Sequence, residues 1–303
     1  MSLGCNCEMG LSNTGRPSCV PIFSVTSSLI MVPLKGNDGV LNAIDLTASV
    51  PVWSTLINEA DSSKRWFPLP QFENVELPKA DSLFEEANSG KMAFLRQGKR
   101  SFSGELWSED STPTLLGKLQ LNRCVDFGVF IIDVNGNLIG SKVGDKLLPI
   151  PVDNPSFDPK FAFATDSTVQ KLMLGFDFDR LFDESTMYMI TPSEAGVNFN
   201  DLEGLVDVVL AEVSLTNALL TATAQFEYGT AYNPLKYKGA DQVTDWAIYD
   251  SANSVVAGGV SAVTEAPDGT YAIGLSGLTT GDVYELRTAK DGFEGKLSFT
   301  AVA

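Results

Sequence analysis

Short runs of β-branched and aromatic residues, separated by Gly, Pro, Asn and Asp, are the dominant pattern along this chain. The run from Pro21 to Pro33 predicts one strand or two, because it is apolar and bounded by prolines. In residues 125–140, two apolar segments flank Asn135-Gly136, which predicts a β-hairpin with a type I′ turn. Residues 206–226 alternate loosely and predict a further strand pair. The pattern therefore indicates a mainly β protein.

Helical patterns are few. Thr112 is a suitable N-cap, Pro113 follows at the first helical position, and leucines recur on one face, so we expect one short helix over residues 112–123. Residues 81–88 form a shorter helical pattern that closes at Gly90. The strand pair that follows is expected to turn at Gly98.

The last part of the chain, residues 236–303, contains short strand patterns separated by turn signals such as Gly258-Gly259 and Asp291-Gly292. Strands at this spacing predict a small immunoglobulin-like β-sandwich. We therefore expect an extended segment over residues 1–20, a β-rich assembly domain of sandwich or barrel type over 21–233, and the small sandwich over 236–303.

Charge and residue usage exclude several classes of function. The 38 acids and 21 bases give a formal net charge of −17, so a protein that grips DNA phosphates with clustered cations is not expected. The chain contains no histidine, which excludes Ser-His-Asp and Cys-His catalysis and His-ligated zinc. No secretory signal and no apolar run approaching roughly 20 residues is present, so we expect no membrane partner. We predict a non-enzymatic protein without a cofactor.

The four cysteines are Cys5, Cys7, Cys19 and Cys124. Cys-x-Cys is tighter than the spacing of zinc knuckles, so we expect no metal there, and the sequence leaves open whether the cysteines are bonded.

An acidic cluster occupies Gly175–Glu184, and its candidate residues are Asp177, Asp179, Asp183 and Glu184. Leu181 and Phe182 stand where an EF-hand loop needs a ligand and a glycine, so we interpret the cluster as an acidic face or loop. The basic residues Arg96, Lys99 and Arg100 form the main cationic group, and we expect them to make salt bridges between subunits.

Two segments carry a family resemblance. Phe94-Leu-Arg-Gln-Gly-Lys-Arg-Ser-Phe-Ser-Gly104 resembles a strand-turn-strand stretch of the major tail tube proteins of long-tailed bacteriophages. Tyr271–Leu278 with Val283–Arg287 resembles the immunoglobulin-like repeats that follow the tube domain in some of them. The cysteine-bearing N-terminal segment departs from that family's pattern.

The resemblance implies a virion protein, made in the host cytoplasm, that forms stacked hexameric rings with copies of itself and contacts other virion proteins. It further implies an acidic lumen through which DNA passes without specific binding. Three alternatives remain open: a capsid decoration or head-completion protein, a cell-surface or glycan-binding module, and a carboxylate enzyme, which would need a deep acidic cleft.

Overall fold

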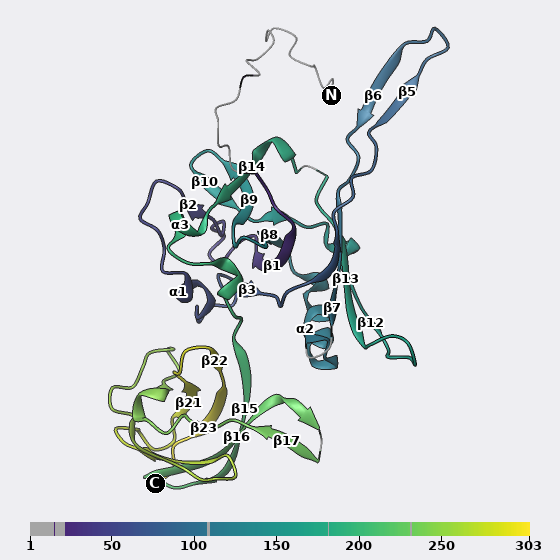
Figure 1. Ribbon diagram of the computed structural model, residues 1–303. Helices are drawn as coiled ribbons and strands as arrows, with labels where there is room; N and C mark the ends of the chain where they lie inside the picture. Colours follow the sequence, from purple (N-terminus) through teal and green to yellow (C-terminus); the bar gives the residue numbers. More distant parts are fainter. Residues whose placement is uncertain (1–14, 16–21, 108–109, 181, 231) are drawn as a thin grey trace.

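The computed structural model describes residues 15, 22–107, 110–180, 182–230 and 232–303. Strands make up 45% of the chain and helices 12%, so the prediction of a mainly β fold is confirmed. Figure 1 shows a larger N-terminal body, from which a long hairpin projects, and a smaller C-terminal sandwich at the other end. In the described part of the chain, no helix has the length and hydropathy needed to span a membrane.

The N-terminal body is built around an eight-stranded sheet with the order β2-β10-β9-β8-β1-β3, to which β11 and β14 add at β8 and β9. Its strands are β1 (Thr26–Pro33), β2 (Ile44–Asp45), β3 (Phe67–Pro68), β8 (Phe127–Asp133), β9 (Leu138–Val143), β10 (Lys146–Leu148), β11 (Ile150–Pro151) and β14 (Met187–Ile190). Leu29 and Met31 of β1 pack into one core, whereas Ile30 and Val32 pack into another on the opposite face. Because both faces are buried, the strand is continuously apolar from Leu29 to Val32 instead of alternating.

A second sheet of four strands, in the order β12-β13-β7-β4, closes the first core. Its strands are β4 (Glu73–Glu76), β7 (Ser101–Trp107), β12 (Asp158–Ala162) and β13 (Lys171–Asp177). Strands β7 and β13 alternate between buried and more exposed positions, so only one face of this sheet is packed. Phe102 and Phe176 stack in that core with ring centroids 5.0 Å apart.

The expected helix forms as α2 (Pro113–Leu121), and the hydroxyl of Thr112 caps it by accepting a hydrogen bond from the Leu115 N–H at 3.2 Å. Two shorter helices, α1 (Trp53–Ile57) and α3 (Pro192–Ala195), lie on the second core and were not predicted. Short 3-10 helices occupy Asn122–Cys124, Asn154–Ser156, Glu184–Thr186, Phe199–Asp201 and Val243–Asp245.

The helical pattern over residues 81–88 was wrong. These residues form strand β5 (Leu83–Glu86), which pairs with β6 (Met92–Arg96) across a turn that contains Gly90. Gly90 has a φ of 78°, which suits a tight turn. Gly98 is not the turn but lies at the base of the hairpin. Pairing with β6 overrides the weak helical preference of this short segment.

The hairpin of β8 and β9 is confirmed, but its turn is not type I′. That turn needs positive φ at both central residues, and only Gly136, with φ 76°, has it. The buried carboxylate of Asp133 instead accepts hydrogen bonds from the backbone N–H groups of Asn135 and Asn137, both at 2.9 Å. The Asp133 side chain therefore caps the turn, and the turn forms with a single residue of positive φ.

The C-terminal sandwich starts earlier than the expected residue 236. Its larger sheet has the order β19-β20-β16-β15-β22, with β17 on β16, and faces a sheet of β18, β21 and β23. The strands are β15 (Val206–Leu215), β16 (Leu219–Thr230), β17 (Asn233–Lys236), β18 (Trp246–Tyr249), β19 (Val260–Glu265), β20 (Thr270–Leu275), β21 (Val283–Thr288), β22 (Phe293–Glu294) and β23 (Lys296–Thr300). Val208 and Leu220 pack into the same core as Trp246 and Tyr271, so the pair β15–β16 belongs to the sandwich.

Candidate assembly site

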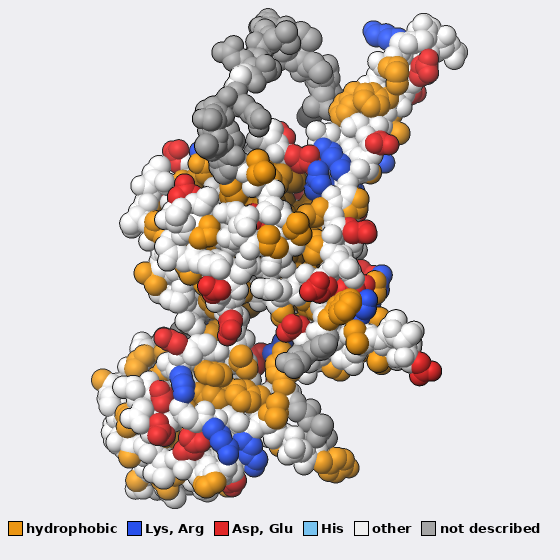
Figure 2. All heavy atoms as spheres, in the orientation of Figure 1, with side chains coloured by type: hydrophobic (Ala, Val, Ile, Leu, Met, Phe, Trp, Pro, Cys, Tyr) orange, Lys and Arg blue, Asp and Glu red, His pale blue; other side chains and the backbone are white. Residues whose placement is uncertain are grey.

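The β5–β6 hairpin, residues 80–98, is the arm of the molecule. It projects from the body, and orange apolar side chains cover much of it in Figure 2. Phe84 and Phe94 face each other across the strands with ring centroids 5.6 Å apart, yet they are 50% and 55% exposed. Leu83, Met92 and Leu95 are also exposed. A two-stranded hairpin alone is at best marginally stable in water, and exposed apolar surface of this kind is typical of an interaction site.

The base of the arm is fixed by the predicted basic group and part of the predicted acidic cluster. Lys99 Nζ lies 2.6 Å from Asp153 Oδ2 and 3.2 Å from Asp177 Oδ2. Arg100 Nε lies 2.6 Å from Glu184 Oε1. The hydrogen bond with Asp153 raises the pKa of Lys99, and the hydrogen bond from Arg100 lowers the pKa of Glu184.

The expected roles of these residues divide accordingly. Lys99 and Arg100 have ion-pair partners within the chain, whereas Arg96 lies on the exposed strand β6, where a second chain could reach it. Asp183 caps the 3-10 helix Glu184–Thr186 by accepting a hydrogen bond from the Ser185 N–H. The backbone N–H of Asp179 donates to the Pro151 carbonyl at 2.9 Å and anchors the loop.

The unpacked face of the four-stranded sheet is acidic. Residues directly opposite in antiparallel strands share a face, and the register places Glu73 beside Glu105, and Glu76 beside Ser103. Asp158 and Asp177 lie on the same face through β13. With the two bases Lys160 and Lys171, the strand residues of this face alone carry a net of −3. Two cations from outside these strands, Lys99 and Arg123, pair with Asp177 and Asp158.

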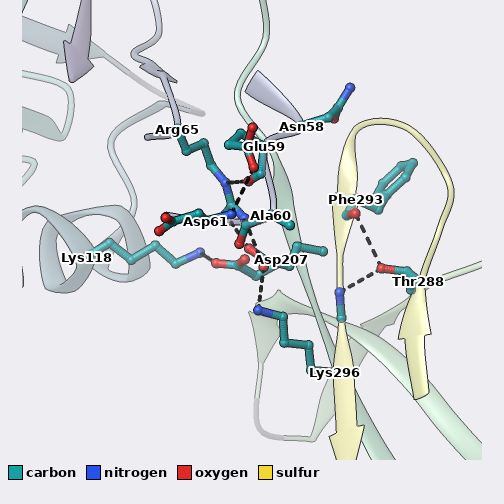
Figure 3. A network of polar contacts seen from close by, with 12 residues as sticks. Asn58, Glu59, Ala60, Asp61, Arg65, Lys118, Asp207, Thr288, Phe293 and Lys296 are labelled. Carbon is teal, nitrogen blue, oxygen red and sulfur yellow. Dashed lines mark hydrogen bonds and ion pairs between the residues drawn. The ribbon is translucent and has the colours of Figure 1, made fainter. Parts of the chain in front are cut away.

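A polar network joins the two bodies (Figure 3). Arg65 is 6% exposed, and its Nη1 and Nη2 donate hydrogen bonds to the two carboxylate oxygens of Glu294 at 2.5 and 3.1 Å. Its Nε donates to the Glu59 carbonyl. Lys118 of α2 contacts Asp207 at 2.5 Å and Glu227 at 2.6 Å. A forked pair of this kind fixes orientation as well as distance.

The charges of this network are held by their partners. Burial would raise the pKa of Glu294, but the hydrogen bonds from Arg65 and Lys296 outweigh burial and lower it. Burial likewise opposes the charge of Lys118, and its hydrogen bonds to Asp207 and Glu227 raise its pKa overall. Both groups therefore stay ionised near neutral pH.

No group of three or more His, Cys, Asp or Glu side chains placed to hold a metal ion occurs among the described residues. Cys124 is a free, exposed thiol, while Cys5, Cys7 and Cys19 lie outside the described residues.

Sequence reasoning missed the apolar residues of the arm and the pairing of Arg65 with Glu294. A signal for the arm was available, because Leu83-Phe84 and Phe94-Leu95 flank Asn88-Ser-Gly90 almost symmetrically. The pair of Arg65 and Glu294 is separated by 229 positions, and no local pattern reports such a contact.

No protein-family model matches the chain, and the search of curated proteins found no match. Among solved structures, the full ectodomain (Ig1–Ig3) of mouse nectin-like molecule 4 aligns with 92% of this chain and 94% of its own, at 9% identity. The TM-score of 0.17 is too low for this likeness to carry an argument.

Proposed function

We propose that this chain is a structural protein that assembles with copies of itself, with the arm as the principal contact between copies. The observation that carries the proposal is the projection of an apolar hairpin whose five large hydrophobic side chains are all exposed. Exposed apolar surface of this kind marks an interaction site. The assembly we propose is the stacked-ring tail tube of a long-tailed bacteriophage, assembled with other virion proteins.

The acidic face of the four-stranded sheet supports the tube. Strands β4 and β12 are the two ends of this sheet, so pairing β4 of one copy with β12 of the next would continue it around a ring. The excess of acids over bases among the strand residues of the unpacked face would then line the lumen and repel DNA phosphates, which would let DNA pass without binding.

The energy available to the arm is substantial. Phe84 and Phe94 each keep about half of their surface in water, which is roughly 100 Å² per ring. At about 25 cal/mol per Å², covering both rings contributes at most about 5 kcal/mol per contact. Because each ring or stack repeats the contact in every copy, loss of the two aromatic side chains should abolish assembly.

The test is the mass and shape of the purified protein by sedimentation and electron microscopy. The natural chain is expected to form rings or tubes, and the double variant Phe84→Ser/Phe94→Ser is expected to be monomeric. The matched control is Val283→Ser, because Val283 is 55% exposed on the sandwich and outside the arm. A natural chain that stays monomeric at high concentration, or a double variant that assembles normally, contradicts the proposal.

A further inference from the structure

An apolar cleft lies where the N-terminal body meets the sandwich. It has a volume of about 750 Å³ and is lined by residues of α2, β3 and the first strands of the sandwich. This volume is within the roughly 300–1,000 Å³ of pockets that enclose whole ligands. The cleft holds exposed apolar side chains: Leu121 is 78% exposed, Leu235 is 52% exposed and Phe67 is 37% exposed.

We infer that this cleft receives the arm of a second copy of the chain, an inference that rests on the proposed self-assembly and names the surface that completes it. The arm offers Phe84, Met92 and Phe94 as apolar side chains that need cover, and the cleft offers the apolar lining that would cover them. Neither surface is covered within the monomer.

Charge favours this pairing over contact elsewhere. Two copies that each carry −17 repel one another, so contact is least opposed where both surfaces are near neutral. The arm, residues 80–98, carries Asp81, Glu85 and Glu86 against Lys91 and Arg96, a net of −1. The charged residues that line the cleft are two bases and two acids, a net of zero: Arg65, Lys118, Asp110 and Asp207.

The placement of the two surfaces determines the kind of assembly. In Figure 1 the arm leaves the body at the end away from the sandwich, while α2 lies toward the sandwich. Residues of α2 line the cleft. From its base at Lys79 and Arg100 the hairpin spans about 30 Å to its tip, at ~3.3 Å per residue, and points away from its own cleft. A copy therefore cannot fill its own cleft, and we take arm-in-cleft contact to be head-to-tail, a contact that repeats from one copy to the next.

The ion pairs between the N-terminal body and the sandwich hold the cleft in shape before an arm binds. Arg65 and Lys118 both line the cleft, and their ion pairs with Glu294, Asp207 and Glu227 hold the two walls at a fixed separation. Because these cations are already paired, the arm meets a cleft whose charges need no new partner.

The experiment places a photoreactive p-benzoylphenylalanine at position 94 of the full-length chain and identifies cross-linked peptides by mass spectrometry after assembly. We expect intermolecular cross-links to Pro113–Leu121 and to the strand pair β16–β17, both of which contribute to the cleft. Assembled particles whose cross-links lie only on other surfaces would overturn the docking inference and leave the proposed function intact. A chain that yields a monomer and no intermolecular cross-link would overturn both.

A second measurement uses Leu121→Asp, with Val283→Asp as a control at an exposed apolar position on the sandwich. Since Leu121 is exposed in the monomer, its substitution should leave the circular dichroism unchanged. If the arm of a second copy buries Leu121, the Leu121→Asp variant should assemble with an affinity lower by about tenfold or more, while the Val283→Asp control assembles normally. Equal assembly of both variants would count against the cleft as the receptor.

Discussion

Replacing Arg65 by Met should destabilise the chain by about 3 kcal/mol. Removing one member of a buried ion pair costs about 3–5 kcal/mol, because the other charge stays buried without a partner. Glu294 keeps a contact with Lys296 at 2.9 Å, and its side chain is 24% exposed, which places the loss at the lower end of that range. The double variant Arg65→Met/Glu294→Met removes both charges and should return to within about 1 kcal/mol of the natural chain.

The assay is urea unfolding followed by tryptophan fluorescence and far-ultraviolet circular dichroism. The measurements are made in the Phe84→Ser/Phe94→Ser background, so that assembly does not contribute to apparent stability. The control is Lys160→Met, since Lys160 pairs with Asp158 at 3.2 Å with both side chains more than half exposed, and its loss should cost no more than about 0.5 kcal/mol. An Arg65→Met loss below about 1 kcal/mol, or a double variant as unstable as the single one, would refute the reasoning.

Three further predictions concern pH, a turn and the arm. The pKa of Glu294 lies below its ordinary value of 4.5, so its contribution to stability is present above that pH and is lost as pH falls further; urea midpoints should therefore drop more steeply in acid for the natural chain than for Glu294→Gln. Asp133→Ala leaves buried donors of the β8–β9 turn without an acceptor and should cost about 2–3 kcal/mol by urea unfolding; an unchanged midpoint would contradict the capping role. A Cβ at Gly98 would overlap the Ala80 carbonyl, so Gly98→Ala should redirect the arm and reduce the assembled mass seen by sedimentation, whereas Gly117→Ala, with open space around it, should not.

Local sequence patterns predicted the elements that are mostly apolar or that are bounded by clear turn and capping residues. The strand Thr26–Pro33, the hairpin around Gly136 and the helix Pro113–Leu121 all follow from burial and capping rules that act within a dozen residues. The arm was misread because Asp81, Glu85 and Glu86 resemble the polar side of a short helix. Only the facing strand β6, with Phe94 opposite Phe84, makes these residues extended.

The boundary of the sandwich was misplaced for a related reason. Tyr228–Leu235 has the glycine, asparagine and proline of a linker, but the structure places most of this stretch in the paired ends of β16 and β17. Membership of β15 and β16 in the sandwich depends on β16 pairing with β20, about 50 residues further on, and on a shared core. Pairing of this range is decided by the packed whole and leaves no mark in a local window.

The distribution of cations connects the architecture to the proposed assembly. Several bases form ion pairs at two structurally important places, the base of the arm and the junction with the sandwich. Lys79, Lys99 and Arg100 hold the base of the arm and so determine its direction. Arg65 and Lys118 hold the walls of the cleft at a fixed separation. In the proposed assembly, the contact between copies is made by apolar side chains such as Phe84 and Phe94, which carry no charge to be repelled. In the proposed assembly an acidic protein stacks with itself through apolar contacts, and the two bases on the strands of its acidic face, Lys160 and Lys171, are outnumbered there by five acids.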